Sequence, residues 1–227
     1  MTLGYLDPIA FYLFSKPIYW YGLIIAMTVL VAYMMADHEA TKRGLKKETM
    51  LDLLLIALPI AFIFARAYYV VFRWDYYSTR KDEIIAIWDG GIAIYGGLLG
   101  GFLVLYFFAR RRGIKIIKML DIIAPSLLVG QMLGRWGNFF NAEAFGGYTN
   151  GPFAMQIKKS IVNPNMLNDA VLHHLVQVNG IDYIQVHPTF LYESVWNLCL
   201  LLLLLWYRKK KKFEGEMFWL YIGGYGL

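Results

Sequence analysis

The stretch Gly134-Arg-Trp-Gly-Asn-Phe-Phe-Asn-Ala-Glu-Ala-Phe-Gly146 closes an apolar segment, residues 119–140, that is long enough to cross a lipid bilayer. A helix of about 20 apolar residues spans the hydrocarbon core. Arg135 lies within this segment, and a charge inside a membrane span is costly enough to indicate a function. Two amides and a carboxylate follow it at Asn138, Asn141 and Glu143. A fixed cation among hydrogen-bonding side chains at the edge of a membrane suits an anionic lipid headgroup.

The composition of the chain is that of an integral membrane protein. Of its 227 residues, 59% are hydrophobic and 17% are charged, and the mean hydropathy is +0.47. Soluble domains average about 45–50% apolar and 25% charged residues. The net charge of +6 comes from basic residues clustered between apolar segments, which favours membrane orientation over binding to nucleic acid. A single cysteine, Cys199, excludes an internal disulfide and a cysteine-based zinc site.

Five apolar segments are long enough to span, and a sixth begins near Met217 and stops at Leu227. The sequence therefore predicts an all-α fold: a polytopic membrane helical bundle formed by residues 1–227 as a single domain. The complete spans are expected at residues 18–36, 51–72, 91–109, 119–140 and 188–207.

The charges of the connecting segments predict the orientation of these spans. Residues 37–50, 110–118 and 208–215 are rich in lysine and arginine, which places them in the cytoplasm by the positive-inside rule. The N-terminus, residues 73–90 and the nearly neutral residues 141–187 then face outward. Residues 141–187 are expected to form a small external cap with a short helix near 167–176, too short for a core of its own.

This orientation gathers the polar residues of the spans near the outer leaflet. Arg66 lies about 9 Å, and Arg135 about 8 Å, below the outer end of its segment at 1.5 Å per residue. Five further polar side chains open spans on the same side: Tyr21, Tyr95, His187, Tyr192 and Glu193.

Each of these residues also has a purely structural interpretation. Either arginine could be an interfacial anchor, and Glu143 could be only a salt-bridge partner for an arginine. Tyr21 could belong to the aromatic belt of the membrane, and His187, which precedes a proline, could be a turn residue.

The glycine run at residues 90–101 has two interpretations as well. Gly96 and Gly100 are spaced as in GxxxG, as are Gly97 and Gly101, and this spacing lets helices approach closely. The functional alternative is that the glycines leave room for a lipid tail or expose a backbone amide. A nucleotide site is disfavoured, because no phosphate-loop lysine follows.

Together these motifs resemble the prolipoprotein diacylglyceryl transferases of bacteria, in order and spacing, over essentially the whole chain. The arginine–asparagine block is the most specific of them. The motifs are Trp20-Tyr-Gly22, Trp88-Asp-Gly-Gly91 through Gly101, Gly134-Arg-x-Gly-Asn138-x-x-Asn141-x-Glu143-x-x-Gly146, His187-Pro-Thr-x-Leu-Tyr-Glu193 and Gly224-Tyr-Gly226.

The resemblance implies a reaction and its location. The family transfers the sn-1,2-diacylglyceryl group of phosphatidylglycerol to the lipobox cysteine thiol of a prolipoprotein signal peptide, forming a thioether and releasing glycerol phosphate. It works in the bacterial inner (cytoplasmic) membrane, and no cofactor or metal is expected. The implied catalytic residues are Arg135, Asn138, Glu143, Tyr95 and His187. The implied substrate-binding residues are Tyr21, Arg66, Asn141, Gly146, Gly96, Gly97, Tyr192, Glu193 and Tyr225.

The sequence departs from the family pattern at two places. Many members carry a histidine at the position of Tyr95, and tyrosine ordinarily keeps its proton at neutral pH, so it is a poor general base. The base is then His187 or the substrate phosphate, or Tyr95 only orients a substrate. The last family signature also includes an arginine a few residues past Tyr225, beyond Leu227, which indicates a sequence cut before that signature.

A transporter of lipid or anionic solute, with its site near the outer leaflet, is the main alternative. Transporters usually bind near the bilayer midplane and often contain internal repeats. The polar residues here lie outward and no repeat is evident, which favours the transferase. A structural scaffold is a third interpretation, and the polar cluster argues against it.

Overall fold

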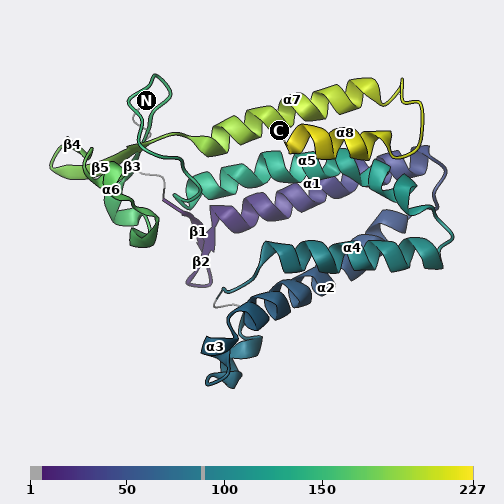
Figure 1. The fold of residues 1–227 in the computed structure, drawn as a ribbon, viewed down its shortest axis with the longest axis horizontal. Helices are drawn as coiled ribbons and strands as arrows, with labels where there is room; N and C mark the ends of the chain where they lie inside the picture. Colours follow the sequence, from purple (N-terminus) through teal and green to yellow (C-terminus); the bar gives the residue numbers. More distant parts are fainter. Residues whose placement is uncertain (1–6, 88–89, 227) are drawn as a thin grey trace. The chain divides into compact units, whose positions relative to one another are not determined.

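The computed structural model describes residues 7–87 and 90–226, and its regular elements are mostly helices (Figure 1). The helices are α1 (Trp20–Lys42), α2 (Thr49–Phe72), α3 (Trp74–Tyr77), α4 (Ile94–Arg111), α5 (Ile116–Phe140), α6 (Asp169–Leu172), α7 (Thr189–Tyr207) and α8 (Glu216–Tyr225). Short 3-10 turns lie at η1 (Lys81–Ile85), η3 (Lys159–Ile161) and η4 (Pro164–Met166). The strands are β1 (Ile9–Leu13), β2 (Lys16–Tyr19), β3 (Met155–Lys158), β4 (Val176–Val178) and β5 (Ile181–Val186).

Four helices of the described chain are long and apolar enough to cross a membrane, namely α1, α2, α5 and α7. This confirms a membrane protein built on helices. The predicted third span forms α4, whose 18 residues include four glycines and end on Arg110 and Arg111, and it is not among the four. The predicted sixth span forms the ten-residue α8.

The chain divides into two compact units, and the boundaries between them fall inside α1, α5 and α8 and in the segment between α7 and α8. The first unit takes in residues 1–32, 125–210 and 220–227, and the second takes in 33–124 and 211–219. The prediction of a single domain stays a prediction.

Glycines bring α2 and α4 together in the second unit. A Cβ atom on Gly96 would lie 2.4 Å from the carbonyl oxygen of Phe64, and one on Gly100 would lie 2.7 Å from the Cβ of Phe64. Only a glycine fits at such distances, so the packing interpretation of GxxxG is confirmed for this pair. Gly97 and Gly101 lie differently, because a Cβ would meet only ordinary contacts at Gly97 and open space at Gly101.

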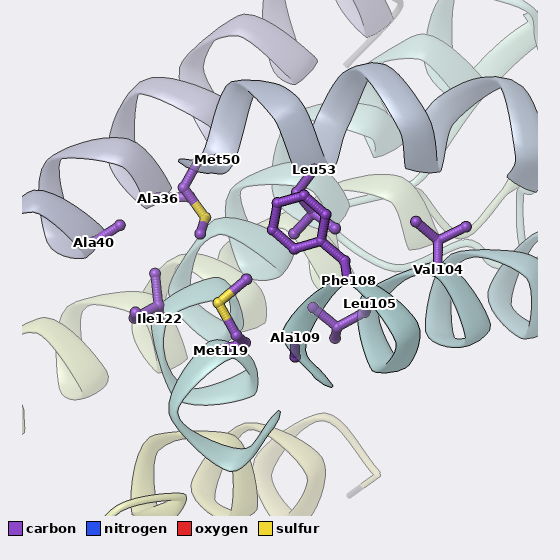
Figure 2. Packing of buried hydrophobic residues seen from close by; sticks show 10 residues of the cluster. All are labelled: Ala36, Ala40, Met50, Leu53, Val104, Leu105, Phe108, Ala109, Met119 and Ile122. Atoms are coloured by element: carbon purple, nitrogen blue, oxygen red, sulfur yellow. The ribbon is translucent and has the colours of Figure 1, made fainter. Parts of the chain in front are cut away.

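The core of the second unit joins four helices (Figure 2). Its buried side chains are apolar and come from the end of α1, the start of α2, the end of α4 and the start of α5. They are Ala36, Ala40, Met50, Leu53, Val104, Leu105, Phe108, Ala109, Met119 and Ile122. Because Ala36 and Ala40 pack here, α1 continues to Lys42, beyond the predicted end at residue 36.

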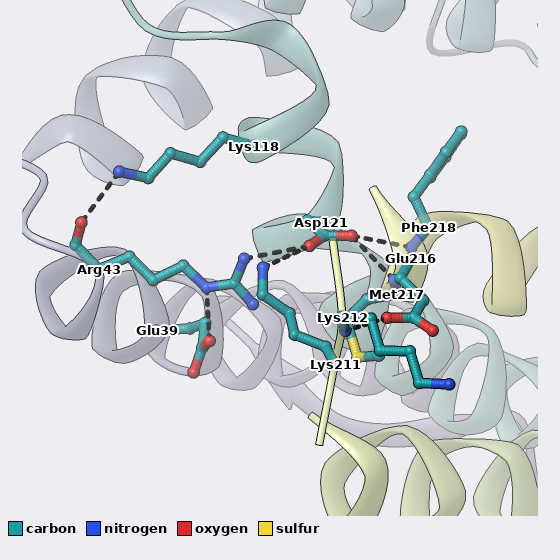
Figure 3. A network of polar contacts seen from close by, with 9 residues as sticks. All are labelled: Glu39, Arg43, Lys118, Asp121, Lys211, Lys212, Glu216, Met217 and Phe218. Atoms are coloured by element: carbon teal, nitrogen blue, oxygen red, sulfur yellow. Dashed lines mark hydrogen bonds and ion pairs between the residues drawn. The ribbon is translucent and has the colours of Figure 1, made fainter. Parts of the chain in front are cut away.

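A buried carboxylate holds several segments of the same unit together (Figure 3). The side chain of Asp121 on α5 has no solvent exposure and accepts from Arg43 Nη1 (3.2 Å) and Lys211 Nζ (2.9 Å). It also accepts from the backbone N–H groups of Met217 (2.9 Å) and Phe218 (3.2 Å), in the first turn of α8. These N–H groups have no acceptor within their own helix, so Asp121 supplies the missing cap. Lys211 thus has a structural contact besides its contribution to orientation.

We expect Asp121→Ala to lower the free energy of unfolding by about 3 to 5 kcal/mol, because two cations and two N–H groups lose their shared acceptor. Asp52→Ala is the matched control. Asp52 pairs with Arg112 where both side chains are more than a third exposed, and such pairs contribute about 0–1 kcal/mol. Thermal unfolding in detergent measures both variants, and equal losses would contradict the role given to Asp121.

The first unit begins with a β-hairpin that the sequence did not predict. Strands β1 and β2 pair antiparallel, with Leu13 opposite Lys16. The two residues between them, Phe14 and Ser15, both have positive φ (46° and 65°). This is the backbone of a type I′ turn, which matches the twist of a two-residue hairpin.

Residues 141–187 contain an antiparallel sheet of order β3-β5-β4, so the all-α prediction is wrong for this segment. Asn179 and Gly180 form the β4–β5 turn with φ values of 51° and 76°, again as in a type I′ turn. The helix expected near 167–176 is reduced to the four residues of α6, and β4 follows it.

The hydrophobic core beneath this sheet draws on the neighbouring helices. Met155, Ile157, Ile184 and Val186 contribute from the strands, and Phe190 of α7 is buried among them. Phe139 of α5 packs against the same cluster and stacks on Phe190 with ring centroids 4.6 Å apart. The segment therefore completes its core with side chains from helix ends.

Candidate functional site

The end of α5 folds back into a small cluster of two amides and a carboxylate. Glu143 Oε1 accepts hydrogen bonds from Asn138 Nδ2 (3.0 Å) and Asn141 Nδ2 (3.3 Å). The backbone makes this return possible, because Ala142 and Ala144 both adopt positive φ (51° and 52°). The N–H of Glu143 also donates to the carbonyl of Asn138 (3.0 Å). The motif spacing thus translates into direct contact among its three polar side chains.

Arg135 lies one helical turn before this cluster and forms an ion pair with Glu193 of α7. Both side chains remain partly exposed, at 28% and 41%. Glu193 is the carboxylate that Arg135 contacts, and the contacts of Glu143 described above are with the two amides. The structural interpretation of Glu143 as a partner for an arginine therefore finds no such contact among the described residues. A partly exposed guanidinium can exchange its carboxylate for another anion.

The motif His187-Pro-Thr-x-Leu-Tyr-Glu193 reaches the same region through its contacts with Gly146. The N–H of Gly146 donates to the carbonyl of His187 (3.0 Å), and the N–H of His187 donates to the carbonyl of Gly147 (3.0 Å). His187 Nδ1 lies 3.2 Å from the hydroxyl of Tyr192. A Cβ atom on Gly146 would lie 2.9 Å from the Cβ of His187 and 3.0 Å from Cγ2 of Thr189. Gly146 is thus needed for the two segments to approach.

Replacement of Gly146 by alanine is expected to push this motif away from the cluster at a cost of about 1–3 kcal/mol, because the new methyl group has no free space. Gly147→Ala is the control, since nothing lies within 4 Å of a Cβ at Gly147. Thermal unfolding of the two variants tests the difference. A Gly146→Ala protein as stable as Gly147→Ala would show that the contact is not tight.

Tyr21 packs on the same helix end. A Cβ on Gly137 would lie 2.8 Å from Cδ2 of the Tyr21 ring, and Trp20 stacks on Phe140 with ring centroids 5.4 Å apart. Residue 137 must therefore stay small for Tyr21 to lie against α5. Tyr21 contacts the helix at Gly137, which lies between Arg135 and Asn138 in the sequence.

Arg66, in the second unit, has a different environment from the predicted one. It is 7% exposed, and its guanidinium donates to four backbone carbonyls. The acceptors are the carbonyl oxygens of Glu83 (2.6 Å), Ile84 (2.8 Å), Gly90 (2.7 Å) and Gly91 (2.8 Å). Gly91 has φ +70°, and a Cβ there would lie 2.5 Å from Arg66 Nη1. The simple interfacial anchor is wrong for Arg66, because its head group binds the protein.

The remaining predicted residues make other contacts. Tyr95 is 70% exposed, and its ring is 6.5 Å from that of Tyr68. Gly96 and Gly97 lie in the same helix, as described above, and only Gly96 contacts α2 closely. Tyr225 stacks on Tyr221, with ring centroids 6.0 Å apart. Trp88 and Asp89, which belong to the motif Trp88-Asp-Gly-Gly91, lie outside the described residues.

The predicted residues thus divide between the two units. The first group is Tyr21, Arg135, Asn138, Asn141, Glu143, Gly146, His187, Tyr192, Glu193 and Tyr225. The second is Arg66, Tyr95, Gly96 and Gly97. The common depth predicted for Arg66 and Arg135 stays a prediction. In residues 7–87 and 90–226, no three His, Cys, Asp or Glu side chains gather as metal ligands would, and the absence of a metal cofactor also stays a prediction.

Comparison with known proteins identifies the family of the chain. A family model described as prolipoprotein diacylglyceryl transferase matches residues 8–227. The chain belongs to the prolipoprotein diacylglyceryl transferase family. Its relatives include the phosphatidylglycerol–prolipoprotein diacylglyceryl transferase of Lysinibacillus sphaericus (strain C3-41), 46% identical over 227 residues, which cover 100% of this chain and 80% of the relative.

Two further bacterial relatives carry the same name. The one from Geobacillus kaustophilus (strain HTA426) is 45% identical over 226 residues, covering 100% of this chain and 79% of the relative. The one from Pediococcus pentosaceus is 44% identical over 224 residues, covering 98% of this chain and 76% of the relative. The resemblance read from the motifs is therefore confirmed.

Within this member of the prolipoprotein diacylglyceryl transferase family, two contacts that position Arg135 were not found from the sequence. Trp136 Nε1 donates to Ser194 Oγ (3.1 Å), and Ser194 Oγ donates to the carbonyl of Met132 (3.0 Å). These bonds fix α5 against α7 beside the pair of Arg135 and Glu193. Ser194 directly follows Glu193 in the sequence, and this position was the signal that could have indicated the two contacts.

Proposed function

We propose that the protein transfers the diacylglyceryl group of phosphatidylglycerol to the cysteine thiol of a prolipoprotein. The family membership supports this activity. The observation that carries it furthest is the partly exposed Arg135, paired with Glu193 next to the cluster of Asn138, Asn141 and Glu143. A cation with an exchangeable partner suits a phosphodiester substrate.

The proposed reaction is a displacement at a glyceryl carbon. The thiolate sulfur forms a bond to the carbon that bears the phosphate ester, and the bond from that carbon to oxygen breaks. The phosphate leaves as glycerol phosphate and takes the bonding electrons. Arg135 binds the phosphate in place of Glu193 and stabilises the charge that develops on it, as a preorganised cation does. The amides of Asn138 and Asn141 supply further donors to the headgroup.

The thiol must lose a proton to react, because the thiolate is the nucleophile. His187 is one acceptor for that proton and the substrate phosphate is the other. The contact of 3.2 Å between His187 Nδ1 and the Tyr192 hydroxyl favours the histidine. When Nδ1 carries the ring proton and donates a hydrogen bond to the Tyr192 hydroxyl, Nε2 is left with a lone pair that can accept the thiol proton. Tyr95 then has an orienting role at most.

The proposed setting is the cytoplasmic membrane of a bacterium, with the N-terminus and residues 141–187 outside. In this arrangement α4 serves as the fifth complete span, and its terminal Arg110 and Arg111 extend to the cytoplasmic surface. The sheet of β3, β4 and β5 forms the external cap. The lipid and the signal peptide, whose lipobox carries the acceptor cysteine, both enter from the membrane.

Membranes that contain the protein, labelled phosphatidylglycerol and a lipobox peptide test this proposal. Transfer of the label to the peptide supports the transferase. Movement of labelled lipid between leaflets, with an unlabelled peptide, would favour the transporter instead.

A further inference from the structure

A groove of about 580 Å³ lies beside the three-stranded sheet of the first unit, and the mechanism above does not use it. It is formed where β3 ends and β5 begins, together with residues of η3 and η4. Small-molecule sites have volumes of about 300–1,000 Å³, so the groove is large enough to hold bound side chains. The lining residues that matter here are Lys158, Lys159, Val162, Leu167, Ile181 and Asp182.

The lining of this groove is apolar with an excess of positive charge. Val162, Leu167 and Ile181 supply the apolar surface. Two lysines stand against one carboxylate, that of Asp182, which accepts a hydrogen bond from Gln177 Nε2 at 3.1 Å. The groove therefore suits a chain that carries both apolar and acidic side chains.

Strand β3 connects the groove with the candidate site. At one end of this strand, Met155 lies opposite Val186, which directly precedes His187. At the other end, Lys158 lies opposite Tyr183 and lines the groove. Tyr183 and His187 are four positions apart in an extended segment, which corresponds to about 14 Å at 3.4 Å per residue.

The same strand can also pair with an extended peptide. It lies at the edge of the sheet, whose order is β3-β5-β4, and it pairs with β5 on its other side. Every second residue of an edge strand directs its N–H and C=O groups away from its neighbour, and peptides bind such edges as an added strand. A peptide strand that starts near His187 would reach the groove after about four residues.

We propose that the edge of β3 and this groove bind the segment of the prolipoprotein that follows the acceptor cysteine, with a preference for acidic side chains about four to six residues beyond it. The inference rests on the proposed function. In the proposed arrangement the cysteine reacts near His187, and the chain beyond it leaves the membrane on the side of the cap. Lys159 then attracts the acidic side chains, while the apolar wall contacts their neighbours.

The test uses lipobox peptides that differ only in the charge of this segment. One carries glutamates at about the fourth to sixth residues after the cysteine, and another carries lysines there. In the unchanged protein we expect kcat/KM for the acidic peptide to exceed that for the basic peptide about five-fold, the effect of a partly exposed charge pair. Glutamates placed directly after the cysteine should give no such preference, because they would lie short of the groove.

Lys159→Glu should reverse the preference between the two peptides, a result that a folding defect cannot produce. Lys16→Glu is the matched control, because Lys16 is an exposed lysine of β2 in the same unit and lies outside the groove. Its preference should equal that of the unchanged protein. Equal rates with both peptides in the unchanged protein, an unaltered ratio in Lys159→Glu, or an equal change in Lys16→Glu would each overturn the proposal. The last result is what a charged membrane surface would give.

Photo-cross-linking separates this proposal from the proposed function, because it needs no transfer. The probe is the acidic peptide with serine in place of the cysteine and a photoreactive residue at about the fifth position after it. We expect cross-links to residues 158–167 or 180–182 of the full chain in lipid nanodiscs. If these cross-links form while no diacylglyceryl group is transferred, the groove stands and the transferase fails. Cross-links confined to other residues would reject the groove.

Discussion

Arg135→Gln is expected to lower the rate of diacylglyceryl transfer by about 100- to 1,000-fold, the effect of removing one preorganised group that stabilises developing charge. Glutamine keeps a hydrogen-bond donor but removes the cation that binds the phosphate. The transfer rate of Arg135→Lys should lie between those of the unchanged protein and Arg135→Gln, because lysine keeps the charge but loses the planar fork of guanidinium donors. Steady-state transfer to a lipobox peptide measures all three proteins.

Arg80→Gln is the control for this comparison. Arg80 is an exposed arginine that contacts Glu83 at 4.0 Å and stacks over Tyr76, so its loss removes the same charge away from the proposed site. Its rate should stay near that of the unchanged protein. Near-normal turnover by Arg135→Gln, in a protein that is inserted and folded, would reject the role of Arg135.

Arg66→Lys should destabilise the second unit by about 3 kcal/mol or more, because a buried carbonyl left without a donor costs about 1–3 kcal/mol and lysine cannot reach all four. Residues 83–87, which include two of these acceptors, should become more sensitive to protease. We expect Gly91→Ala to act in the same way, since its methyl group would lie 2.5 Å from Arg66 Nη1.

Gly113→Ala separates this clash from backbone strain. Gly113 has a similar positive φ (65°), but nothing lies within 4 Å of a Cβ there. Gly91→Ala should therefore cost more stability than Gly113→Ala. A raised KM for phosphatidylglycerol in Arg66→Lys, with residues 83–87 as resistant to protease as before, would instead show that Arg66 binds the substrate directly.

Hydrophobic length predicts the long helices well, because a membrane span must be apolar over its whole length. The segments predicted at 51–72, 119–140 and 188–207 form α2, α5 and α7 within a few residues. The strands were missed, because β1–β5 have three to six residues each and show no long alternation. The turn at Asn179-Gly180 was the readable signal for one hairpin.

The candidate site was predicted where it depends on local spacing and missed where it depends on distant contacts. Asn138, Asn141 and Glu143 lie within one short motif, and they meet as the motif implies. The pairing of Arg135 with Glu193 joins residues 58 positions apart in two different motifs, so spacing within a motif cannot show it. The acceptors of Arg66 are backbone carbonyls, which every residue carries, and no residue type marks them in a sequence.

The most direct test of the account is the mass of a lipobox peptide after incubation with the protein and phosphatidylglycerol in lipid nanodiscs. The account predicts a gain equal to one diacylglyceryl group on the cysteine, in a thioether that resists reducing agents, with glycerol phosphate released in equal amount. A peptide in which serine replaces the cysteine should stay unmodified. An unchanged cysteine peptide beside intact phosphatidylglycerol would contradict the account.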